Sequence, residues 1–154
     1  MTPHRRINFS FGGVLALLII GTSACDEKLS DIAGPSPNLQ PTFTSIQTEI
    51  FETTDASGRA ACTQCHTDVG RTPSGNLNLR HDVAFANLVN VASRAKAGAV
   101  RVVPGDPGNS YILHKLEGRS DIVGERMPRT GGPYLTSGQI SILTRWIATG
   151  AKND

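Results

Sequence analysis

The feature that most constrains this chain is the run Cys62-Thr63-Gln64-Cys65-His66, in which two thiols stand three residues apart and a histidine follows the second. Residues at i, i+3 and i+4 share one face of a helical turn, so both sulfurs and the imidazole point the same way. This spacing is the attachment signature of a c-type haem, in which the thiols bond the two vinyl groups of one porphyrin and the histidine binds the iron. Because the motif occurs once, it predicts a single covalent haem c bound by Cys62, Cys65 and His66.

A Cys-x-x-Cys pair also occurs in thioredoxin-like dithiol sites and in halves of zinc sites. Zinc takes four ligands, and the chain has no second cysteine pair, so a zinc site would need an irregular set that includes His81 and His114. A dithiol site follows a β-strand, whereas residues 55–61 have the Ser and Gly content of a turn that leads into a short helix. Both alternatives therefore fit the sequence less well than haem attachment.

A haem held by one histidine has an open axial position, which electron-carrying cytochromes fill with a second protein ligand. Met127 is the candidate, because it is the only methionine after the initiator. Pro128 biases it towards extended backbone, as expected for a loop that covers the open face. A single methionine is commonly a core filler, but this Gly-rich, charged segment has little core to fill. The second choice is His114, whereas His81 is interpreted as a surface residue.

Residues 1–24 predict an export signal. Arg5 and Arg6 precede the apolar run 14–20, which is shorter than the roughly 20 residues needed to cross a bilayer. Small residues then lead to Cys25, as in the lipobox of bacterial lipoproteins, whose cysteine is acylated and begins the mature chain. Cleavage after Ala24 without acylation is the alternative, although it leaves an unpaired thiol. We therefore expect a lipid-anchored protein of the bacterial cell envelope, facing the periplasm or the outer surface, or else a soluble periplasmic one.

The remaining chain divides into a tether and one domain. Residues 25–41 carry the lipidated terminus and a polar, proline-containing segment without periodicity, which predicts a flexible linker. Residues 42–154 form the expected domain. Apolar periodicity and capping patterns predict helices over residues 44–53, 62–66, 82–90, 110–117 and 136–149. Long loops rich in Gly and Pro join them, and residues 100–103 predict a brief extended segment. The expected fold class is all-α with at most a very short β segment.

Several local contacts follow from this assignment. Thr44 with Gln47, and Thr136 with Gln139, have the spacing of capping boxes. Asp55 or Ser57 is expected to cap the helix of the haem motif. A proximal histidine usually donates its second ring hydrogen to a backbone carbonyl, and residues 72–73 are the expected source.

Taken together, these features resemble class I mono-haem cytochrome c domains, most closely secreted bacterial domains of the planctomycete type. The resemblance implies a cytochrome c-like fold with crossing terminal helices, His66 as proximal ligand and Met127 as distal ligand. The expected N-terminal helix lacks the glycine that lets the two terminal helices approach closely in the best-known members. The segments that carry the similarity, besides the haem motif, are Thr42–Ile50, Pro104–Ile112, His114–Gly118, Arg126–Pro128 and Trp146–Ala151.

The function that these residues indicate is one-electron transfer by a membrane-tethered carrier, not an enzyme. An iron with both axial positions filled does not readily bind substrate, and a thioether ligand favours the ferrous state. The alternatives are a haem-bearing subunit of a larger redox complex, and a haem enzyme or gas sensor with a displaceable sixth ligand. Expected partners are a redox protein and the membrane, and Arg119, Arg126 and Arg129 predict a positive docking rim near Met127. Charge is only modestly uneven along the chain, which gives no case for nucleic-acid binding, because that would need a far denser basic face.

Overall fold

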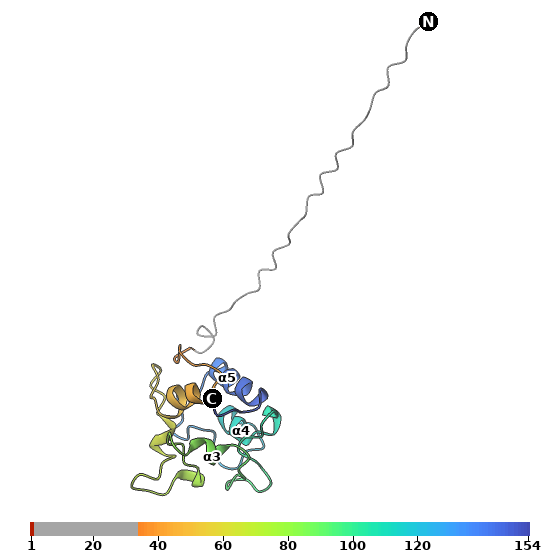
Figure 1. The fold of residues 1–154 in the computed structure, drawn as a ribbon. Coiled ribbons are helices and arrows are strands. Elements are labelled where there is room, and N and C mark those ends of the chain that lie inside the picture. Colours follow the sequence, from red (N-terminus) through yellow and green to blue (C-terminus); the bar gives the residue numbers. More distant parts are fainter. Residues whose placement is uncertain (2–33) are drawn as a thin grey trace.

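The computed structural model describes Met1 and residues 34–154. The expected export signal from residue 2 onward, Cys25 and the first part of the tether lie outside the described residues. Within the described part the regular elements are helices and there is no β-strand, which agrees with the expected all-α class (Figure 1). None of the helices found there is long and apolar enough to span a bilayer.

The first helical segment consists of α2, Phe43–Ile46, which continues directly into the π-helical turn η1, Gln47–Phe51. The capping box expected from Thr44 and Gln47 is wrong. The side chain of Thr42 caps α2 instead, and Asp154 accepts hydrogen bonds from the amides of Phe43 and Thr44, both at 2.8 Å. The C-terminal end of the chain therefore lies against the start of α2 (Figure 1).

Short helices separated by loops form the middle of the chain. The helix expected over residues 82–90 is shorter, because Val89 leaves helical geometry and forms a bridge with Val102. Val100 forms two further isolated bridges, so the expected extended segment is present as isolated β-bridges and not as a strand. The elements are η2 Cys62–Gln64, η3 Ser74–Asn76, α3 Ala84–Leu88, η4 Pro107–Asn109 and α4 Tyr111–Glu117.

The final helix is α5, Ser137–Ala148, and its expected capping box is confirmed. The Thr136 hydroxyl accepts the amide of Gln139 at 3.2 Å, and the Gln139 side chain accepts the amide of Thr136 at 2.9 Å. The sequence pattern places Ile140, Leu143, Trp146 and Ile147 on one apolar face. In the structure Leu143, Trp146 and Ile147 are buried, Ile142 is buried with them, and Ile140 is only half-buried.

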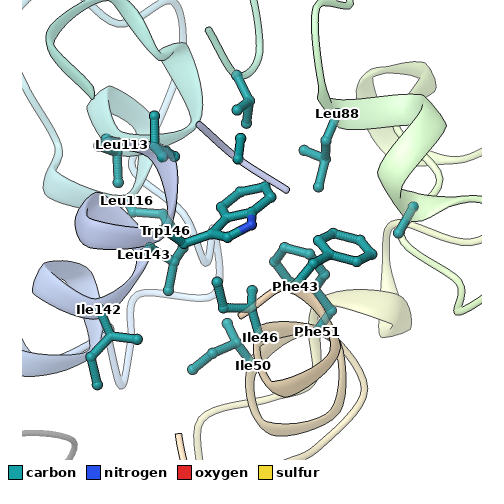
Figure 2. Close-up of a cluster of buried hydrophobic side chains, with 14 of the residues drawn as sticks. Phe43, Ile46, Ile50, Phe51, Leu88, Leu113, Leu116, Ile142, Leu143 and Trp146 are labelled. Atoms are coloured by element: carbon teal, nitrogen blue, oxygen red, sulfur yellow. The ribbon is translucent and has the colours of Figure 1, made fainter. Parts of the chain in front are cut away.

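The core gathers around Trp146 of α5 (Figure 2). Leu113 and Leu116 of α4 pack on one side of it, and the ring of Phe43 from α2 lies 5.6 Å from the indole, between centroids. The first and last helices therefore meet through an aromatic contact. This contact fixes η1, and with it the haem motif that follows, relative to the pair α4 and α5.

The packed domain begins before residue 42. Leu39 is fully buried in the core, and the buried hydroxyl of Ser36 accepts a hydrogen bond from the Gln139 side chain at 2.9 Å. Residues 36–41, which were assigned to the flexible tether, belong to the packed domain because these two side chains find partners in it.

Candidate haem site

The haem motif forms one tight turn, as its spacing predicts. The amides of Cys65 and His66 both donate to the carbonyl of Cys62, at 3.2 and 2.9 Å. Both thiols are free; that of Cys65 is exposed, whereas Cys62 is half-buried and packs against the core. The expected side-chain cap of this turn is wrong, because Ala61 occupies the capping position of η2.

Asp55 instead organises the segment that leads to the motif. Its carboxylate accepts the amides of Ser57 and Arg59, at 2.9 and 3.2 Å, and pairs with the buried guanidinium of Arg59 at 3.0 Å. Arg59 also donates to the carbonyl of Ile50 at 3.2 Å, and the thiol of Cys62 donates to the same oxygen at 3.4 Å. The sequence gives little sign of this buried ion pair, since an acid four residues before a base is common on protein surfaces.

The His66 imidazole is held by the loop that follows it. Its Nδ1 lies 3.2 Å from the carbonyl of Leu77, which accepts hydrogen bonds only, so Nδ1 carries the proton and Nε2 remains available. The expectation that residues 72–73 supply this carbonyl is wrong. Gly75, with a φ of +61°, turns the chain back at η3 and brings the carbonyl of Leu77 to the ring.

The ionisation of these groups favours metal ligation by His66 over dithiol redox chemistry. Burial lowers the pKa of His66, against smaller opposing effects of hydrogen bonds that the ring donates to the backbone of Leu77 and Ser74, and the neutral imidazole is the form that binds a metal. Burial raises the pKa of the Cys62 thiol to about 11, whereas a reactive dithiol needs a lowered pKa. Over residues 34–154, no group of three or more His, Cys, Asp or Glu side chains is placed to hold an ion such as zinc.

Met127 lies in a loop, and its side chain is half-buried against the same core as Cys62. Together with five other partly exposed apolar side chains, these two form what we call the apolar rim of the core. A porphyrin is a flat apolar group with a polar edge, so partly exposed apolar side chains on the core, an available imidazole and two free thiols are the kinds of group that would hold it. The apolar rim consists of Cys62, Leu77, Phe85, Val89, Ile112, Met127 and Ile140.

His114, the second choice for an axial ligand, has both ring nitrogens engaged. Its Nδ1 lies 2.8 Å from the Asp121 carboxylate, and its Nε2 lies 2.8 Å from the carbonyl of Gly108. Both nitrogens therefore face an acceptor oxygen of the protein instead of an open metal position. His81 is exposed beside Glu52, at 3.5 Å, as expected for a surface residue.

The positive rim expected near Met127 is largely neutralised. Arg119 pairs with Glu117, and Arg129 lies 3.6 Å from the carboxylate of Glu125. The third arginine, Arg126, stacks 4.0 Å above the centre of the Tyr134 ring. This surface therefore offers less steering of an acidic partner than the sequence alone indicated.

Comparison of the chain with protein-family models, with curated proteins and with solved structures gives no match.

Proposed function

We propose that this chain is a c-type cytochrome that carries single electrons on one haem, attached through Cys62 and Cys65 and ligated by His66 and Met127. The observation that carries the proposal is the orientation of His66, whose Nδ1 donates to Leu77 and whose Nε2 is left available beside two free thiols. When bound, the haem supplies the one-electron redox centre. The aromatic contact of Phe43 with Trp146 supports a cytochrome c-like arrangement of the terminal helices.

The side chains that would hold the haem suit electron transfer better than catalysis. Cys62 would anchor the group at the apolar rim, and His66 is fixed through the carbonyl of Leu77. Met127 would close the second axial position and, as a thioether, favour the reduced state. With both positions occupied by side chains, no site remains for a substrate, so the protein serves as a carrier.

The cofactor assignment predicts that haem stays with the denatured polypeptide through acid and organic extraction, because two thioether bonds hold it. The measurement is the haem absorbance of the extracted protein. The double variant Cys62→Ser with Cys65→Ser is the control, and should lose its haem completely under the same treatment. Quantitative loss of haem from the wild-type chain would disprove covalent attachment.

We also propose that Cys25 carries the lipid anchor and places the protein in the bacterial envelope. The wild-type protein should then partition with membranes, and Cys25→Ser should release it or leave an unprocessed precursor, because acyl chains supply the anchor. Thr22 stands where a lipobox usually has leucine, so Thr22→Leu is the matched control and should remain in the membrane fraction. Wild-type protein that is soluble and begins at an unmodified Cys25 would support simple secretion instead.

A further inference from the structure

The loop that carries Met127 is attached to α4 at several points, and Lys115 supplies the most direct of them. Its backbone carbonyl accepts the amide of Met127 at 2.9 Å. Its ammonium group donates to the carbonyl of Val123 at 3.0 Å and to the carbonyl of Glu125. Lys115 therefore holds the loop at three places, which are Val123, Glu125 and the proposed ligand Met127.

Other contacts from α4 secure the rest of this loop. Arg126 donates to the carbonyl of Leu116 at 2.7 Å, and the Tyr111 hydroxyl accepts the amide of Val123 at 2.9 Å. The approach is close, since a Cβ at Gly118 would lie 2.8 Å from the Arg126 side chain. Between Gly118 and α5 the chain contains no helix. The conformation of the loop therefore depends on these contacts.

We propose that Lys115 is the positioning residue for Met127, an inference that rests on the proposed axial ligation. Lys115 acts through the backbone of the loop, to which it is hydrogen-bonded. A lysine ammonium has three donors and no acceptor, so one side chain can bind two backbone carbonyls at once. A neutral thioether is a weak ligand, and its hold on iron depends on how firmly its loop is kept in place. Loops with few internal hydrogen bonds open at low free-energy cost.

The test compares Lys115→Met with Lys115→Arg in the haem-loaded protein. The methionine variant keeps the apolar stem and loses all three donors, whereas arginine keeps the charge and the donors. The readout is the affinity of the ferric protein for added imidazole, which must displace Met127. We expect Lys115→Met to bind imidazole about tenfold more tightly, equivalent to ~1.4 kcal/mol, and Lys115→Arg to stay close to wild type. Lys152→Met removes an exposed lysine elsewhere and should change nothing.

Hydrogen exchange provides a second readout that does not depend on ligand chemistry. In Lys115→Met the amides of residues 119–127 should exchange faster, while those of α5 keep their protection. If the methionine variant does not fold, Lys115→Gln replaces it, since the glutamine amide keeps a donor and should give an intermediate gain in imidazole affinity.

The results distinguish the positioning role of Lys115 from the axial ligation by Met127 on which it rests. A wild-type protein without covalent haem, or without a sulfur-to-iron charge-transfer band, would overturn the proposed ligation and the role of Lys115 with it. A wild-type protein that shows both, with unchanged imidazole affinity in the Lys115 variants, would overturn the positioning role alone.

Discussion

Met127→Ala is expected to abolish the sulfur-to-iron charge-transfer band of the ferric protein. It should also lower the reduction potential by roughly 0.1 V or more, within the ~0.8 V span that axial ligands set. Met127 is the only internal thioether, lies half-buried on the apolar rim with Cys62, and has its amide fixed by Lys115. Its removal would open an axial position, so the reduced variant should bind carbon monoxide. Visible spectra and a redox titration measure these effects.

Two controls limit the interpretation of this experiment. Ile122→Ala shortens a half-exposed apolar side chain in the same loop and should leave spectrum and potential unchanged. His114→Ala should also retain the band, because both ring nitrogens of His114 are already hydrogen-bonded. Met127→Ala with an unaltered spectrum and potential would show that another residue is the sixth ligand. Strong carbon monoxide binding by the wild type itself would favour a haem enzyme or gas sensor over a carrier.

The features that were predictable from the sequence depend on residues close together in the chain. Thr136 and Gln139 bond each other's backbone across a single turn, so the start of α5 is visible in the sequence. Gly118, with a φ of +72°, ends α4 for a similarly local reason. The turn that aligns Cys62 with His66 follows from helical spacing alone.

Contacts between distant parts of the chain were not predictable. Besides its cap Thr42, the start of α2 is held by Asp154, more than a hundred residues from Phe43, and no local pattern indicates this second contact. The carbonyl that orients His66 belongs to Leu77 because of how η3 turns, and the anchoring of Met127 by Lys115 depends on how α4 packs. The four candidate haem residues can therefore be identified from the sequence pattern, whereas the residues that would hold them in place can be identified only from the folded structure.

The buried pair of Asp55 and Arg59 gives the largest stability prediction. Asp55→Ala should lower the free energy of unfolding by about 3–5 kcal/mol, because it leaves a buried guanidinium without its counter-charge. Arg59 is 1% exposed, and its other bonds go to backbone carbonyls such as that of Ile50, none of which carries a negative charge. Asp55 also accepts a hydrogen bond from Gln139 at 3.3 Å, so the pair joins the haem-motif segment to α5. Urea unfolding of the haem-loaded protein, followed by circular dichroism, measures the loss.

The pH dependence of this contribution has a definite sign. Burial raises the pKa of Asp55, but hydrogen bonds from Ser57 and Gln139 and the charge of Arg59 outweigh it, so the pKa lies below its ordinary value of 3.8. The carboxylate therefore stabilises the fold fully above that value, and its contribution disappears as the pH falls through the lower folded-state pKa. The stability gap between wild type and Asp55→Ala should be widest near neutral pH and should narrow in acid. If the difference in stability between wild type and Asp55→Ala does not change with pH, loss of the carboxylate charge is not the cause of the destabilisation.

An exposed ion pair supplies the matched control for this experiment. Asp68 pairs with Arg80 at 2.8 Å, with both side chains about half exposed, so Asp68→Ala should destabilise the protein far less than Asp55→Ala, because solvent screens an exposed pair. Replacing Asp55 with Ala and Arg59 with Met together removes both the negative carboxylate and the positive guanidinium. The double variant should therefore be less destabilised than the sum of the two single variants, because it leaves no unpaired charge in the core. Additive losses would mean that the two side chains stabilise the protein independently, through packing and their separate hydrogen bonds.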